Sequence, residues 1–121
     1  MQSNYLFENK RDYLYLTIDG IYNKEEFISY PKIISDECVK ENISKVLINA
    51  LNVKGTDVSI LDRFSLGVQI AEVLSSKIKI AVIWPEKDIN KFAENVASNR
   101  GGFIFVCGNV TEGENWLLNK L

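Results

Sequence analysis

The sequence predicts an α/β domain in which helices pack against a mixed sheet of four or five strands. Two observations carry this prediction. Short apolar runs alternate with amphipathic segments along most of the chain, and short polar loops join them. Such alternation is typical of strand–helix–strand units with right-handed crossovers and largely parallel pairing. The length of 121 residues, without repeats or an interdomain linker, then predicts one domain over residues 1–121.

The strands are expected where short runs of aromatic and β-branched residues stand between polar turns. Residues 13–18 form the first long run, which ends at Asp19-Gly20 and pairs with a short strand near residues 5–7. Three further apolar runs are of the kind that a sheet buries on both faces: residues 46–48, 78–84 and 103–107. The prediction is an N-terminal hairpin followed by three core strands.

Two long helices are predicted between these strands. The first begins after Asn23, whose side chain can cap it while Glu26 reaches back, and it ends near Glu41. Pro31 falls inside this pattern, so the helix either kinks there or restarts. The second helix fits residues 59–76, because apolar residues recur there at helical spacing in a wide stripe.

Two shorter helices complete the prediction. Residues 89–97 have apolar positions at helical spacing, with Asp88 at the start and Gly101-Gly102 after the end. Thr111 and Glu114 form a capping box that opens a C-terminal helix.

The composition argues against several classes of function. The 14 basic and 16 acidic residues give a net charge of −2 without a lysine or arginine stripe, so no nucleic-acid partner is expected. No apolar run approaches the roughly 18 residues that suggest a membrane span. The first four residues lack the pattern of a signal peptide, so a cytoplasmic location is expected.

The chain contains no histidine. This removes the usual general base and the commonest metal ligand. Its two cysteines, Cys38 and Cys107, match no metal or redox spacing and are predicted to be buried, reduced thiols. We therefore expect a protein that is not an enzyme and that uses no metal and no cofactor.

The opening of the second helix carries a family resemblance, together with other segments that follow in a fixed order. These segments are Gly20, Tyr30-Pro31, residues 45–48, Asp62-Arg63-Phe64-Ser65-Leu66-Gly67, residues 79–83 and residues 114–117. In this order they resemble the STAS domain, the fold of bacterial anti-sigma factor antagonists, and more closely its SpoIIAA-like branch, also labelled STAS/SEC14-like. The resemblance covers nearly the whole chain and implies the SpoIIAA-like (STAS) fold.

The sequence departs from that family at its phosphorylation site. In the phosphorylated antagonists the second helix opens with Asp-Ser-Ser-Gly-Leu-Gly, and a partner kinase modifies the second serine. The matching positions here are Asp62, Leu66 and Gly67. Arg63 and Phe64 replace the two serines, and Ser65 replaces the glycine. Ser65 lies about 100° around the helix from the acceptor position, so its phosphorylation would need a partner that approaches from another direction.

The resemblance implies a non-enzymatic regulatory or protein-interaction module that binds a protein partner. We expect the binding surface at the start of the second helix, with four candidate residues: Asp62, Arg63, Ser65 and Leu66. Charge at a helix start interacts with the macrodipole, and an arginine fork suits carboxylate or phosphate. On this hypothesis Arg63→Glu abolishes a complex without lowering stability.

Structural roles remain open for the same residues. Asp62 can cap the helix or compensate its dipole, and Arg63 can be a solvated surface residue. Phe64 lies on the apolar stripe and is expected in the core, which leaves Leu66 as the better candidate for exposure. Gly67 is expected to permit close helix packing.

A small-molecule or lipid carrier of the SEC14-like type is the alternative function. Asn49 and Asn52 lie at or after the end of one central strand, Trp84 follows the next, and open α/β sheets bind ligands at this edge. A pocket lined by Asn49, Asn52 and Trp84 is therefore expected. The structural alternatives are a turn over residues 52–57 and a tryptophan packed under the next helix. Formation of a homodimer is left open.

Overall fold

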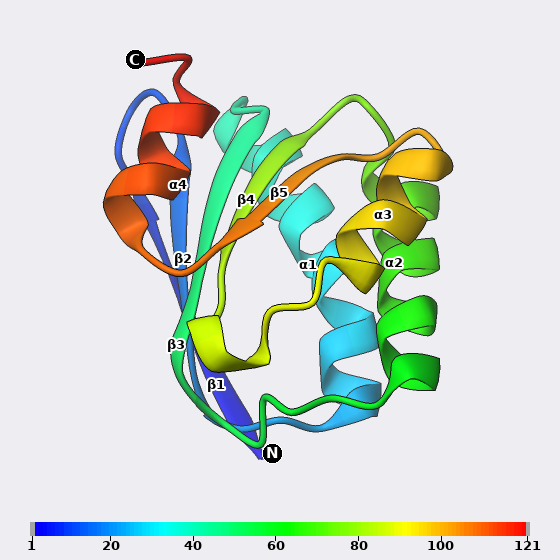
Figure 1. The fold of residues 1–121 in the computed structure, drawn as a ribbon. Coiled ribbons are helices and arrows are strands. Elements are labelled where there is room, and N and C mark those ends of the chain that lie inside the picture. The colour runs from blue at the N-terminus through cyan, green and yellow to red at the C-terminus, as the bar shows by residue number, and fades with distance from the viewer. Residues whose placement is uncertain (1, 121) are drawn as a thin grey trace.

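A five-stranded sheet forms the centre of the protein, with helices on both of its faces (Figure 1). The computed structural model describes residues 2–120. The strands are β1 (Ser3–Asn9), β2 (Leu14–Ile21), β3 (Lys45–Lys54), β4 (Lys79–Ile83) and β5 (Phe103–Cys107). The helices are α1 (Lys24–Glu41), α2 (Ile60–Leu74), α3 (Phe92–Asn99) and α4 (Val110–Leu117), and a 3₁₀ turn spans Glu86–Asp88.

The strands lie in the sheet in the order in which they occur in the chain. β1 is antiparallel to β2, and β2 to β5 are parallel. Because crossovers between neighbouring parallel strands share one hand, α1, α2 and α3 lie together on one face of the sheet. α4 follows the last strand and packs against the other face. The predicted α/β class with a mixed sheet is confirmed.

Alternation along the strands supplies two apolar layers, one on each face of the sheet. The layer between the sheet and α1, α2 and α3 combines Leu14, Leu16 and Ile80 from the strands with Ile34 of α1 and Leu74 of α2. The smaller layer under α4 includes Leu47, Ala81, Ile83 and Leu117. Cys38 and Cys107 are buried in different layers, and both thiols are free, as predicted. Burial raises the pKa of the Cys38 thiol to about 11, so this group stays protonated at neutral pH.

Both long helices begin where the sequence signals place them. The Asn23 side chain accepts a hydrogen bond from the Glu26 N–H at 3.1 Å and caps α1. The Ser59 hydroxyl accepts from the Asp62 N–H at 3.2 Å and caps α2. α1 remains one helix through Pro31, so the restart considered at that residue does not occur.

The starts of the two shorter helices differ from the prediction. α3 begins at Phe92, because Asp88 makes long-range contacts instead of capping the helix. Its carboxylate accepts from the Thr56 hydroxyl at 2.6 Å, and its carbonyl accepts from the Arg63 guanidinium at 2.8 Å. These bonds hold the 3₁₀ turn against the loop that follows β3.

At the C-terminal end, α4 is capped by Asn109 rather than by Thr111. The Asn109 side chain accepts from the Glu112 N–H at 2.8 Å. Glu114, the expected partner of Thr111, accepts from the Tyr13 hydroxyl at 2.6 Å and so joins α4 to the start of β2.

β2 runs through Asp19-Gly20 to Ile21, beyond its predicted end. Gly20 has a φ of +103°, and a Cβ atom there would lie 2.5 Å from the Gln2 carbonyl oxygen. No side chain larger than a hydrogen atom fits at this distance. Glycine at position 20 therefore lets β1 and β2 stay paired to the end of the two strands.

Glu26 joins β1 to α1 through its carboxylate. The carboxylate accepts hydrogen bonds from the Ser3 hydroxyl at 2.5 Å, from the Gln2 N–H at 2.8 Å and from the Ser3 N–H at 2.9 Å. These bonds, above all the one from the Ser3 hydroxyl, lower the pKa of Glu26 below its ordinary value of 4.5. A carboxyl group whose pKa is lowered by folding stabilises the fold above its unfolded-state pKa. The contribution is lost as pH falls through the folded-state pKa.

Glu26→Gln is therefore expected to lower the urea midpoint more at about pH 7 than at about pH 3. At the lower pH, protonation of Glu26 already removes the stabilisation by its carboxylate from the unmodified protein. Urea unfolding followed by circular dichroism at both pH values measures this difference. Glu25→Gln, at the exposed neighbouring carboxylate, is the control and should show little dependence on pH. An effect of Glu26→Gln that is the same at both pH values would contradict the assignment.

Candidate functional site

α2 has one face turned to the core and one turned to solvent, and its orientation differs from the prediction. The buried positions follow i, i+4 spacing through Arg63, Gly67 and Ala71. Phe64 is 42% exposed, whereas Leu66 is half-buried and packs against the core. The expectations for both side chains are therefore wrong. The apolar stripe was placed about one residue away from the true buried stripe, which contains an arginine and a glycine.

Gly67 permits close packing of α2 on α3, as expected. A Cβ atom on Gly67 would lie 2.7 Å from the Ala93 carbonyl oxygen and 2.9 Å from the Val96 Cβ. No larger residue fits there unless the two helices separate.

Three large apolar side chains are exposed at the start of α2. Ile60, Leu61 and Phe64 have exposed fractions of 54%, 78% and 42%. We call these three residues the α2 apolar patch. Since residues three and four positions apart share one side of a helix, Phe64 lies next to both of the others. The Arg100 guanidinium carbon stands 5.2 Å from the centroid of the Phe64 ring and borders the patch with positive charge.

Asp62 and Ser65, two of the predicted partner-binding residues, make contacts within the protein. The Asp62 carboxylate accepts from the Tyr22 hydroxyl at 3.0 Å and lies 3.6 Å from the Lys24 ammonium. Burial, and then the bond to Asp62, raise the pKa of Tyr22 well above its ordinary range. The Ser65 hydroxyl donates to the Leu61 carbonyl one turn earlier at 3.2 Å. Asp62 thus ties the start of α2 to the segment between β2 and α1.

Arg63 is buried, with 8% of its surface exposed, and this corrects its expected surface position. Its Nε donates to the Val58 carbonyl at 2.7 Å, and Nη2 donates to the carbonyls of Asp88 at 2.8 Å and Thr56 at 3.4 Å. Nη1 donates to the Asn90 side-chain oxygen at 3.4 Å. The guanidinium therefore holds the β3–α2 loop to the segment before α3. Within residues 2–120 it forms no ion pair with a carboxylate.

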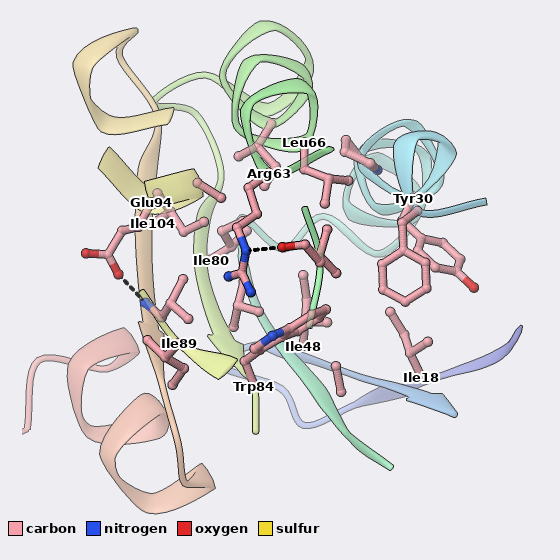
Figure 2. A pocket seen from close by; sticks show the side chains of 18 of the residues that line it. Ile18, Tyr30, Ile48, Arg63, Leu66, Ile80, Trp84, Ile89, Glu94 and Ile104 are labelled. Atoms are coloured by element: carbon pink, nitrogen blue, oxygen red, sulfur yellow. Dashed lines mark hydrogen bonds between the residues drawn. The ribbon is translucent and has the colours of Figure 1, made fainter. Parts of the chain in front are cut away.

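A cavity of about 120 Å³ lies between the sheet and the three helices on its first face. Its sheet side is formed mainly by Ile18, Ile48, Ala50, Ile80 and Ile104, and its helix side includes Tyr30, Leu66 and Ile70. Figure 2 shows Arg63 extending from α2 into this space, toward Trp84. The Trp84 indole N–H donates to the Thr56 carbonyl at 3.2 Å, which fixes the ring as one wall.

Of the three residues predicted to line a pocket, only Trp84 does so. Asn49 lies on the other side of β3, where its side-chain nitrogen donates to the Tyr15 hydroxyl at 2.9 Å and its oxygen accepts from the Leu51 N–H. Asn52 is exposed. The strand end does not form the expected polar pocket, because the apolar cavity lies deeper, under the helices.

No group of three histidine, cysteine, aspartate or glutamate side chains in residues 2–120 is placed to hold a metal ion. In the same residues, no helix is both long and apolar enough to cross a membrane.

Comparisons with known proteins identify the fold. No protein-family model matches the sequence, and no curated protein matches it significantly. Among solved structures, an anti-sigma factor antagonist from Mycobacterium paratuberculosis is similar, with a TM-score of 0.62 and 9% identity over 96% of this chain and 94% of that one. A protein with a SpoIIAA-like fold from Shewanella loihica gives a TM-score of 0.54 and 18% identity over 95% of this chain and 93% of that one. The chain therefore has the SpoIIAA-like fold that its STAS resemblance implies.

Proposed function

We propose that this protein is a regulatory module that acts by binding another protein, without catalysis, and that the partner docks on the α2 apolar patch. The observation that carries the proposal is the joint exposure of Ile60, Leu61 and Phe64 on one helix. A contiguous group of exposed apolar side chains commonly marks an interaction site. The likeness to a protein named as an anti-sigma factor antagonist supports a regulatory role.

The start of α2 is well suited to docking because the protein already holds it in place. Ser59 caps the helix, and Asp62 contacts both Tyr22 and Lys24. A preorganised surface loses little conformational freedom on binding, so more of the contact energy contributes to affinity. Full burial of a large apolar side chain contributes about 1.5 to 3 kcal/mol, and a partner adds the part that corresponds to the still exposed surface of these residues.

Binding without a phosphate switch is part of this proposal. At the two positions where the family has serines, Arg63 is buried and Phe64 is one of the exposed apolar residues. The neighbouring hydroxyl, that of Ser65, is bonded to the Leu61 carbonyl. We therefore assign recognition to apolar contact rather than to phosphorylation at the start of α2.

The double substitution Leu61→Glu with Phe64→Glu is expected to weaken the complex by at least about 30-fold, because it places charge at the centre of the docking surface. Native mass spectrometry of the protein isolated gently from its natural host identifies the partner, and titration with the purified partner measures the affinity. Val39→Glu is the matched control, since Val39 is 80% exposed but lies on α1. Full affinity of the double variant, or equal loss in the control, would rule out docking at this patch.

A second candidate function, a carrier of a small apolar molecule, is favoured by the cavity of about 120 Å³ beside Trp84. The same native spectra test it, because a bound small molecule adds mass that denaturation removes. A second copy of the chain would appear there as a dimer, and such a dimer without another partner would count against the regulatory proposal.

A further inference from the structure

We infer that the cavity binds a small apolar carboxylate, with its carboxylate against Nη1 of Arg63 and its hydrocarbon part among the apolar walls. The inference rests on the second candidate function and specifies its ligand class.

The first argument is the hydrogen-bonding capacity of Arg63. A guanidinium has five N–H donors, and four hydrogen bonds from Arg63 are formed with other described residues. Two of them, to Val58 and Asp88, are 2.7 and 2.8 Å long, whereas the bonds to Thr56 and Asn90 are 3.4 Å long. The long bond to Asn90 is the one formed by Nη1. Nη1 can therefore donate to a ligand without loss of the two short bonds.

The second argument is charge. All four acceptors around Arg63 are neutral carbonyl or amide oxygens. A buried cation without an opposite charge is unfavourable, and carbonyl dipoles compensate only part of the loss of water. The Asp88 carboxylate is bonded to the Thr56 hydroxyl and forms no ion pair with Arg63. A ligand carboxylate supplies negative charge in direct contact with the guanidinium and forms the strong, charge-assisted bonds that guanidinium favours.

The third argument is the shape and chemistry of the cavity. Apart from Arg63, the residues that face its centre are mostly aliphatic or aromatic. An engineered apolar cavity of about 150 Å³ binds the six carbons of benzene, so about 120 Å³ suits a hydrocarbon part of about five carbons. Trp84 forms one wall and should report occupancy by its fluorescence.

Among residues 2–120, Glu94 alone brings a carboxylate to the cavity lining, and this carboxylate is engaged elsewhere. Its oxygen accepts from the Val106 N–H at 2.5 Å, as the dashed line in Figure 2 shows, and lies 3.2 Å from the Lys91 ammonium. Lys91 also donates to the Val106 carbonyl. This pairing limits the repulsion that Glu94 would exert on an anionic ligand.

Titration of the full chain with hexanoate and with hexanol tests the inference. The variant Trp116→Phe leaves Trp84 as the single tryptophan, and calorimetry on the unmodified protein gives the affinities. We expect hexanoate to quench Trp84 and to bind about 10- to 100-fold more tightly than hexanol, because only the acid brings a negative charge to the guanidinium. Equal affinities would overturn the role of Arg63 and leave the carrier function standing. No binding of either compound would overturn both.

The variant Ala93→Leu places extra volume in the cavity and locates the site. It should reduce hexanoate affinity at least about 10-fold, while circular dichroism and the melting temperature show whether the fold is kept. If Ala93→Leu does not fold, Leu66→Phe on α2 serves as the second filling variant. Unchanged hexanoate affinity in a folded filling variant would place binding elsewhere and overturn the inference.

Discussion

Replacement of Arg63 by methionine is expected to lower the free energy of unfolding by about 2 to 4 kcal/mol. The change leaves the Val58 and Asp88 carbonyls without their guanidinium donor, and each buried acceptor left unpaired costs about 1 to 3 kcal/mol. The Thr56 carbonyl keeps the Trp84 indole N–H and should contribute little. Methionine keeps most of the side-chain length, so the effect reports the lost hydrogen bonds more than lost packing.

Urea unfolding measures this change, with Arg100→Met as the matched control. Arg100 is exposed and its guanidinium lies over the face of the half-exposed Phe64 ring, so its replacement should change stability by less than about 0.5 kcal/mol. Equal, small effects of both variants would refute the structural role of Arg63. The earlier expectation that Arg63→Glu leaves stability unchanged depended on a surface position, which the burial of Arg63 contradicts.

Gly67→Val is expected to lower the free energy of unfolding by about 3 kcal/mol. The Cβ atom added at position 67 would lie 2.7 Å from the Ala93 carbonyl oxygen. This oxygen belongs to the backbone of α3 and cannot move without the helix. α2 and α3 must therefore separate, and overpacking of this kind typically costs about 1 to 3 kcal/mol or more.

The control for this substitution is Glu72→Val, which introduces the same β-branched side chain at an exposed position of α2. Thermal unfolding of both variants compares the steric clash at position 67 with the effect of a valine on helix propensity at an exposed position. If Gly67→Val is no less stable than Glu72→Val, the two helices are not in the close contact described here.

Local signals in the sequence were sufficient for most of the fold. Asn23 and Ser59 cap their helices through bonds to residues only three positions ahead, and the apolar strand runs need no distant partner to be recognised. The start of α3 was missed because Asp88 bonds to Thr56, 32 positions away in the sequence, instead of capping the helix. The start of α4 was available locally, since Asn109 caps it through a bond to the Glu112 N–H three positions ahead. The long-range bond from Tyr13 to Glu114 explains only why Glu114 does not complete the predicted capping box.

The candidate site was harder to predict for the same reason. Arg63 is buried because carbonyl groups from two separate loops converge on it, and no local pattern reveals that arrangement. The position of Asn49 could have been inferred, because alternation along β3 puts it on the face opposite Ile48 and Ala50. The helical stripe of Arg63, Gly67 and Ala71 was also visible, but an arginine in a stripe is ordinarily assigned to the surface.

Hydrogen–deuterium exchange of the isolated complex against the free protein tests docking on the α2 apolar patch most directly. The first N–H groups of a helix lack intrahelical acceptors, so those of Ile60 and Leu61 should exchange readily until a partner covers them. The account predicts slower exchange over residues 59–65 in the complex, with α4 unchanged. Slower exchange confined to α4 or to β1, with residues 59–65 unchanged, would contradict it.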